Sequence, residues 1–253
     1  MATRESAVRV GLVYPELLGT YGDRGNALVL VQRCRWRGID AEVVEVEAGT
    51  PIPDSLDVYL FGGGEDDPQT MAAAGLRASR AAIERGWQSG GVVFAVCAGF
   101  QLIGRRYVAA DGTVLEGIGL IDAVTNAGPS RLIGEVVVDP DPPLPRLTGF
   151  ENHGGRTTLG PGVRPLGQIV TGGGNGDGSG TDGALAERLI GTYLHGPVLP
   201  RNPALADHLL GWVVGDLDPL DSPWEERLRA ERLTAGAKTG VAKWWQDRML
   251  ARG

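Results

Sequence analysis

The chain has 253 residues, 42% of them hydrophobic, which is enough to bury the core of one large α/β domain or two small ones. Its formal net charge of −7 argues against nucleic acid as a partner. The start lacks a secretory signal, no apolar run is long enough to cross a membrane, and the two cysteines lack CxxC spacing, so we expect a cytoplasmic protein with free thiols.

Strand and helix patterns alternate through the first part of the chain. Apolar strands are predicted at 8–15, 41–47, 56–66 (which runs into three glycines) and 92–96, with helices at 22–38 and 77–90. Asp23 is the candidate N-cap of the first helix, and Gly38 ends it. Short apolar strands of this kind are typical of a mostly parallel sheet that helices cover on both faces.

The middle of the chain reads as strands with little helix between them, at 117–126, 132–140 and 148–160. This pattern predicts an antiparallel extension of the sheet, and 184–197 then returns to an apolar strand. The segment 171–183 contains seven glycines. A phosphate-cradling loop is one reading of it, but the Lys-Ser/Thr of a P-loop is absent, so a mobile hairpin tip is favoured.

The tail at 222–253 begins with a strong helix start. Ser222 can cap the helix, Pro223 suits its first turn, and Glu225 completes a capping box. We therefore expect one domain over 1–221 and a helical tail packed on that same domain. The expected packing residues are Trp224, Leu228, Trp244 and Trp245. The alternative is a docking element for a partner chain.

Cys97 ends the apolar strand of "GGVVFAVCAGFQLIG", just before a new helix. A sharp turn from strand to helix projects its central side chain outward, and Ala95 and Gly99 are small enough to permit the close approach that this needs. The start of the helix would favour a thiolate, and the N–H of Ala98 would point toward an oxyanion. A buried structural cysteine is the alternative reading of this stretch.

A cysteine nucleophile generally needs a base, and histidine is the usual one. His195 closes the apolar strand of "LIGTYLHGP" and is the favoured base, with His153 of "FENHGG" as the competing candidate. His208 and Cys34 lie in helical patterns, so we expect them to be structural.

The glycines of "LFGGGED" at 60–66 add a second element, because consecutive glycines after a strand let backbone N–H groups turn toward a ligand. Together with Cys97 and His195 they predict an acyl-transfer site that has a nucleophile, a base and oxyanion donors at strand ends.

These motifs carry a family resemblance. "VCAGFQLIG", "FGGGED" and "GTYLHGPVLPRNP" resemble the glutamine amidotransferases that use a Cys-His pair on a flavodoxin-like sheet. More closely, "GTYGDRGN", "SRLIGE", "GFENHGGRT" and the glycine-rich loop before "IGTYLHGP" resemble the small glutaminase subunits of lipid II isoglutaminyl synthases. The resemblance covers roughly residues 8–215.

The resemblance implies a flavodoxin-like, mostly parallel α/β sheet flanked by helices and an amidotransferase domain over 1–221. It implies hydrolysis of L-glutamine to glutamate and ammonia, and a heterodimer with a Mur-ligase-like large subunit. That partner would amidate the D-glutamate of lipid II, which is membrane-bound, in peptidoglycan synthesis. ATP and Mg²⁺ are expected on the partner, and neither cofactor nor metal is expected in this chain.

The resemblance also assigns roles to residues. Cys97 would attack the carboxamide carbon of glutamine, and His195 would act as base and then as acid for the departing ammonia. Arg131 would hold the α-carboxylate of glutamine. The other implied pocket residues are the oxyanion donors Gly64 and Ala98, and Gln101, Asn152 and His153 near the bound glutamine.

The sequence departs from the class at two points. Ala95 stands where many members have glycine, and "His195-Gly196-Pro197" replaces the usual His-Pro-Glu, which removes the acid that orients the imidazole. Either a dyad suffices or another carboxylate, such as one from the partner, orients His195, and the isolated chain would then be a poor glutaminase.

Three rival functions stay open. Cobyric acid synthases share the elbow and a "GYExH" stretch, but they carry an additional nucleotide-binding domain for which this chain has no room. The others are a stand-alone cysteine hydrolase acting on a peptide or ester, and a non-catalytic binding module in which Cys97 is structural.

Overall fold

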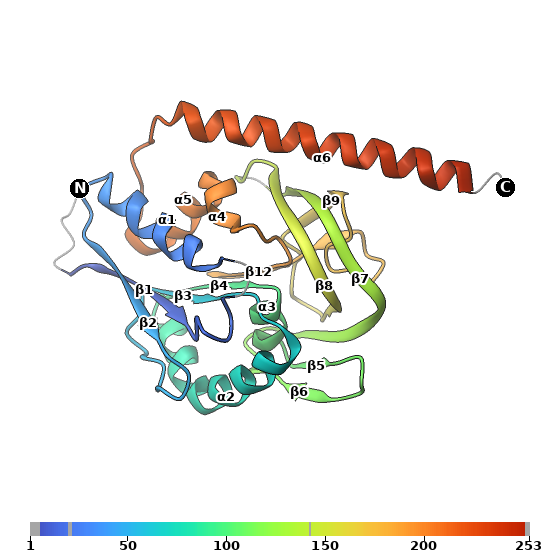
Figure 1. The fold of residues 1–253 in the computed structure, drawn as a ribbon. Coiled ribbons are helices and arrows are strands. Elements are labelled where there is room, and N and C mark those ends of the chain that lie inside the picture. Colours follow the sequence, from blue (N-terminus) through green and yellow to red (C-terminus); the bar gives the residue numbers. More distant parts are fainter. Residues whose placement is uncertain (1–5, 20–21, 142, 251–253) are drawn as a thin grey trace.

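The computed structural model describes residues 6–19, 22–141 and 143–250, with side chains at all of these except 66–67 and 237–250. A six-stranded sheet in the order β11-β12-β4-β3-β1-β2 forms its centre (Figure 1). The strands are β1 (Val8–Val13), β2 (Ala41–Val46), β3 (Val58–Phe61), β4 (Val92–Val96), β11 (Ala184–Ala186) and β12 (Leu189–Thr192). All neighbours pair in parallel except β11, which adds an antiparallel edge.

Helices cover both faces of this sheet (Figure 1). One face carries α1 (Arg24–Arg35), α4 (Val198–Arg201) and α5 (Pro203–Val214), and the other carries α2 (Asp66–Gln88) and α3 (Ala98–Ile103). Because both faces are covered, β3 and β4 are buried at every residue. The predicted mostly parallel sheet flanked by helices is confirmed.

The second helix of the chain, α2, begins earlier than the predicted 77–90. It starts at Asp66, directly after the glycine run. Three alanines at 72–74 favour helix strongly, and Pro68 lies in the first turn, where the missing N–H has no effect on the helical ladder.

A second six-stranded sheet forms the predicted antiparallel extension. Its strands are β5 (Arg106–Val108), β6 (Val114–Glu116), β7 (Ala123–Pro140), β8 (Leu147–Leu159), β9 (Gly167–Thr171) and β10 (Thr181–Asp182). Only β5 and β7 pair in parallel within its described ladders. The register of β7 against β8 shifts between Ala127 and Leu132, and such irregularities redirect side chains out of the regular alternation.

The C-terminal helix α6 (Pro223–Leu250) runs along β7, β8 and β9 and continues past the rest of the body (Figure 1). Its first turn is held by Glu225, which pairs with the guanidinium of Arg33 on α1 at 2.8 Å. Arg33 is buried, and it also pairs with Asp207 of α5 at 2.7 Å, so one cation joins three helices. Within the described part of the chain, no helix combines the length and the apolar character needed to cross a membrane.

The apolar residues expected to pack α6 onto the domain behave differently. Trp224 is 77% exposed, so that expectation is wrong for this residue, and Leu228 is 38% exposed. The ion pair of Glu225 fixes the first turn with Trp224 turned outward. Trp244 and Trp245 lie outside the described side chains.

Candidate active site

Three of the predicted site segments meet at one edge of the central sheet. The glycine run follows β3, Cys97 follows β4, and His195 lies three residues beyond β12. β4 lies between β3 and β12, with Phe61 beside Ala95 and Thr192 beside Val96. Because parallel neighbours end at the same edge of a sheet, all three segments lie at its carboxyl end, where open α/β sheets bind their ligands.

Cys97 forms the sharp turn that the sequence predicts. Its backbone lies at φ 50° and ψ −105°, a conformation that costs a non-glycine residue about 1–3 kcal/mol. The Cys97 N–H donates to the carbonyl of Thr192 at 2.9 Å, and Gly99 N–H donates to the carbonyl of Gly62 at 3.0 Å. A Cβ at position 99 would lie 2.5 Å from the carbonyl oxygen of Phe61, so only glycine permits this turn.

The thiol of Cys97 is held in its protonated form. Its side chain is buried, and burial, followed by the charge of Asp23, raises the pKa of the thiol to about 12. The N–H of Ala98 and the charge of Arg131 lower this pKa, but they do not offset the burial. The N–H of Ala98 at the start of α3 thus favours the thiolate, as predicted, but burial outweighs it and the net pKa is raised in this conformation.

His195 is positioned by its backbone. Its N–H donates to the carbonyl of Phe150 on β8 at 2.8 Å, and its carbonyl accepts from the Phe150 N–H at 3.1 Å. The ring is buried, and burial, followed by His153 and Arg131, lowers the pKa of His195 to about 3. At neutral pH the imidazole is uncharged, so its lone pair can accept a proton.

The glycine run faces Cys97. A Cβ on Gly64 would lie 2.7 Å from the carbonyl oxygen of Leu17 and 3.7 Å from the Cβ of Ala98, so the backbone at 64 lies beside the residue that follows Cys97. The preceding N–H, from Gly63, donates to the carboxylate of Asp23 at 2.7 Å. This arrangement leaves Gly64 and Ala98 as neighbouring sources of backbone N–H groups next to the thiol.

Arg131 and Asn152 come together on the β7–β8 hairpin. The guanidinium donates to the side-chain oxygen of Asn152 and to its backbone carbonyl, each at 3.0 Å. Arg131 lies in the irregular stretch of β7 and is exposed, yet its charge lowers the pKa of both Cys97 and His195. The structure therefore brings a cation and an amide to the same edge as the thiol and the imidazole.

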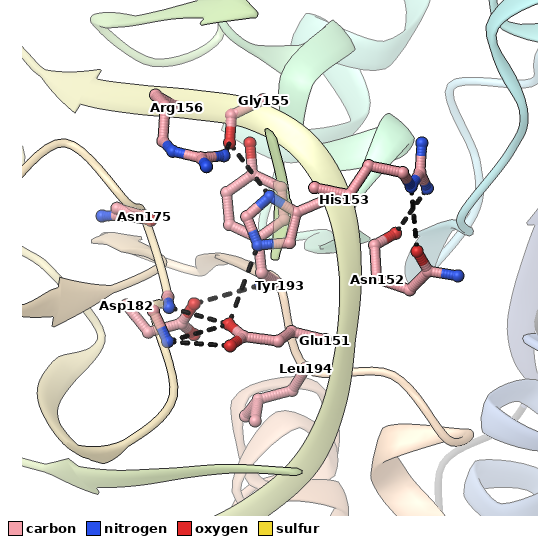
Figure 2. A network of polar contacts seen from close by, with 12 residues as sticks. Glu151, Asn152, His153, Gly155, Arg156, Asn175, Asp182, Tyr193 and Leu194 are labelled. Atoms are coloured by element: carbon pink, nitrogen blue, oxygen red, sulfur yellow. Dashed lines mark hydrogen bonds and ion pairs between the residues drawn. The ribbon is translucent and has the colours of Figure 1, made fainter. Parts of the chain in front are cut away.

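His153 turns to the other face of β8. Figure 2 shows Asn152 on one side of the strand and Glu151 and His153 on the opposite side. His153 is buried, stacks on the ring of Tyr193 at 3.7 Å, and bonds to the carbonyl of Gly155 at 3.0 Å. Its contacts are those of a residue that supports the site from behind, and it contributes to the lowered pKa of His195.

Gln101 is also engaged within the protein. Its oxygen accepts from Gln69 at 2.7 Å, and its nitrogen donates to the hydroxyl of Tyr193 at 3.3 Å. The same hydroxyl bonds to Thr157 at 2.6 Å, and burial raises the pKa of Tyr193. Gln101 thus belongs to a buried polar chain behind Cys97.

Sequence reasoning missed Glu151 and Asp182. The carboxylate of Glu151 accepts the N–H groups of Gly173 and Gly174 at 2.8 and 2.9 Å and lies 3.8 Å from the ring nitrogen of His153 (Figure 2). The glycine-rich segment does connect the paired strands β9 and β10, but its base is anchored by this carboxylate rather than left as a simple hairpin tip. A lone glutamate two residues before a histidine carried no signal of such a contact.

Asp182 is the second missed residue. It is fully buried at the end of β10, where it accepts the hydroxyl of Thr192 at 2.6 Å. Burial raises its pKa to about 6. The two residues predicted to be structural are placed on helices: Cys34 is buried in α1, and His208 lies on α5 against Trp212.

Comparisons with known proteins agree with the geometry. The model of the CobB/CobQ-like glutamine amidotransferase domain matches residues 9–203. The subunit GatD of lipid II isoglutaminyl synthase (glutamine-hydrolyzing) from Staphylococcus aureus (strain N315) is 38% identical over 194 residues, which cover 76% of this chain and 79% of the relative. GatD from Streptococcus pneumoniae (strain ATCC BAA-255 / R6) is 37% identical over 205 residues, which cover 80% and 79%.

A crystal structure of a glutamine amidotransferase superposes with a TM-score of 0.57 at 17% identity, covering 82% of this chain and 99% of that one, which shows the shared fold. With the family model matched along most of the chain, the resemblance read from the motifs is confirmed. The chain belongs to the CobB/CobQ-like glutamine amidotransferase family.

Proposed function

We propose that this chain is a glutaminase subunit that hydrolyses L-glutamine and delivers ammonia to a Mur-ligase-like partner, which amidates the D-glutamate of lipid II. One observation carries the chemistry: the strained turn at Cys97 lies at the same sheet edge as His195, with Gly64 beside Ala98. The likeness to the two GatD subunits carries the choice of acceptor and partner.

The proposed reaction begins at the sulfur. Cys97 Sγ attacks the side-chain carboxamide carbon of glutamine while its proton passes to His195. The N–H groups of Gly64 and Ala98 stabilise the oxyanion of the tetrahedral intermediate. His195 then gives the proton to the leaving ammonia, and a γ-glutamyl thioester remains on Cys97. Water hydrolyses the thioester, which releases glutamate and restores the thiol.

Arg131 is the proposed receptor for the α-carboxylate of glutamine. A guanidinium can bind a carboxylate through two parallel hydrogen bonds. Asn152 orients this guanidinium at the edge where the substrate must lie, and it would line the same pocket. Gln101 and His153 would act through Tyr193, by holding the buried wall of the pocket.

We further propose that the chain is a poor glutaminase on its own. Proton transfer from a thiol with a pKa of about 12 to an imidazole with a pKa of about 3 is unfavourable, because both charged forms are desolvated. The partner must therefore stabilise the cationic imidazole, for example by placing a carboxylate beside His195. Ammonia release by the chain with and without its partner tests this, and full activity of the chain alone refutes it.

The matched pair of cysteines tests the nucleophile. Cys97→Ala should abolish glutamine hydrolysis and covalent capture by the glutamine analogue diazo-oxo-norleucine, and Cys34→Ala should retain both. Ammonia release and the mass of the labelled chain are the measurements. Unchanged hydrolysis after Cys97→Ala would remove the proposal. A chain that cleaves peptides or esters but not glutamine would instead be a stand-alone cysteine hydrolase.

The acceptor is tested separately. We expect a Mur-ligase-like chain to co-purify from the native host, and we expect that ligase, rather than this chain, to bind ATP and Mg²⁺. The reconstituted complex should transfer ammonia from glutamine to lipid II, measured as a mass decrease of about 1 Da per amidated carboxyl. Transfer to a cobyrinate-type acceptor instead would favour the alternative amidotransferase.

A further inference from the structure

The carboxylate of Asp23 has a use that differs from helix capping. Asp23 directly precedes α1, but its side chain makes no capping hydrogen bond and is 2% exposed. One of its oxygens accepts the N–H of Gly63 at 2.7 Å, and the other accepts the side-chain amide of Asn26 at 3.0 Å. A Cβ on Gly62 would lie 2.8 Å from the Cβ of Asp23, so the glycine run rests directly on this side chain.

Asn26 continues the connection on the far side of the site. It is also 2% exposed, and its side-chain oxygen accepts the N–H of Leu199 at 2.9 Å. Leu199 lies in α4, which begins directly after the turn that contains His195. The same turn packs closely on α1, because a Cβ on Gly25 would lie 2.6 Å from the ring of Pro197.

Three consecutive hydrogen bonds therefore join the two sides of the site. They run from the N–H of Gly63 to Asp23, from the amide of Asn26 to Asp23, and from the N–H of Leu199 to Asn26. Buried hydrogen bonds of this kind are costly to break, because each freed group stays away from water. Their lengths leave little freedom in the separation of the glycine run and the histidine turn.

We propose that Asp23 and Asn26 are positioning residues that set the separation between the oxyanion donors after β3 and the base after β12. The inference rests on the proposed function. It explains why a charge is kept in a buried place: both groups that face the carboxylate are donors, so an amide at position 23 would oppose one donor with another. The burial itself raises the pKa of Asp23 to about 6.

The three hydrogen bonds, called the link below, have fixed donors and acceptors, and this permits a sharp test. Asp23→Asn leaves a donor facing a donor, and Asn26→Asp leaves two carboxylates facing each other. The exchanged double variant, Asp23→Asn with Asn26→Asp, keeps every bond: the new amide accepts from Gly63 and donates to the new carboxylate, which also accepts from Leu199. The matched control is Asp207→Asn, which removes a charge from the ion pairs of Arg33 and Arg37 and not from this link.

The measurement is glutamine hydrolysis by the full chain, alone and with its partner, as kcat per site titrated with diazo-oxo-norleucine. We expect each single variant to lower kcat about 10–100-fold with a smaller change in KM, and the exchanged variant to recover to within about threefold. Asp207→Asn should lower the melting temperature without lowering kcat per titrated site, since a merely structural loss reduces the number of folded sites.

Two results would overturn the inference: single variants whose kcat stays within twofold of the parent, or a folded exchanged variant as slow as the single ones. If the single variants do not fold, the kcat of the exchanged variant alone tests the inference. If the exchanged variant does not fold either, Asn26→Ala is measured, and an unchanged kcat in that variant rejects the positioning role. A parent chain that neither releases ammonia nor is labelled even in the presence of its partner would instead reject the proposed function.

Discussion

The two sides of the proposed active site are built in different ways. At the ends of β3 and β4 the geometry is set by the backbone, through carbonyl contacts and glycines that admit no side chain, as at Gly99. On the β7–β8 hairpin it is set by side chains, such as the carboxylate of Glu151 and the guanidinium of Arg131. The first kind should fail by steric conflict, and the second by loss of individual polar contacts.

The largest effect is expected at the backbone-built side. Gly99→Ala would drive a methyl group against the carbonyl of Phe61, so α3 must move and carry Cys97 with it. We expect glutamine hydrolysis to fall about 100-fold and the free energy of unfolding to fall by about 1–3 kcal/mol. Ammonia release and urea unfolding measure the two. Gly154→Ala, where a Cβ meets nothing within 4 Å, is the control and should change neither.

On the hairpin side, Arg131→Ala should weaken substrate binding rather than distort the elbow. A lost charged hydrogen-bond pair predicts a rise in KM of about 10–100-fold with a smaller change in kcat. Arg131→Lys should recover only part of the affinity, because an ammonium cannot bind a carboxylate in two parallel bonds. Arg85→Ala removes an exposed arginine that pairs with Asp54, and it serves as the control. An unchanged KM would contradict the assigned role.

The next effect concerns the anchor of the glycine-rich segment. Glu151→Gln replaces one acceptor oxygen by a donor that faces the N–H groups of Gly173 and Gly174. We expect the free energy of unfolding to fall by about 1–3 kcal/mol, measured by urea unfolding. Glu231→Gln breaks only an exposed pair with Arg227 and should change stability by less than about 0.5 kcal/mol. Equal losses in the two variants would argue against the anchor.

The smallest expected effect is a change in how the free energy of unfolding depends on pH. Burial raises the pKa of Asp182 from 3.8 to about 6, so the folded chain binds this proton more tightly than the unfolded chain. Its contribution to stability is full below pH about 4 and is lost as the pH rises through about 6. Asp182→Asn should therefore remove a decline of at most about 1.4 kcal/mol per pH unit in this window. Urea unfolding between pH 4 and 7 measures it, and an unchanged slope would contradict the assignment.

The backbone-built side is the part that sequence reasoning could reach. A run of apolar residues that ends in Ala95-Val96-Cys97-Ala98-Gly99 has few other conformations, since small residues on both sides permit only a close strand-to-helix turn. The glycine run after β3 and the apolar strand before His195 can likewise be predicted from local sequence. Their meeting at one edge of the sheet then follows, because parallel strands joined by helices share one carboxyl edge.

The side-chain-built parts depended on contacts between distant residues. Asp23 has the residue type and the position of a helix cap, yet its carboxylate accepts a hydrogen bond from Gly63, forty positions away in the sequence. Trp224 has the pattern of a packing residue, yet the pairing of Glu225 with Arg33 turns it outward. Neither choice is encoded by residue type and spacing, because each is decided by which donor the fold brings within reach.

The burial of Cys97 has a consequence for the sensitivity of the protein to oxidants. Peroxides and electrophiles react with the sulfur anion, and their attack also depends on access. A sulfur that keeps its proton and shows 5% of its surface gives these reagents little to react with. We therefore expect Cys97 to resist oxidation in the chain without substrate, and the proposed function requires that glutamine binding make the thiol reactive.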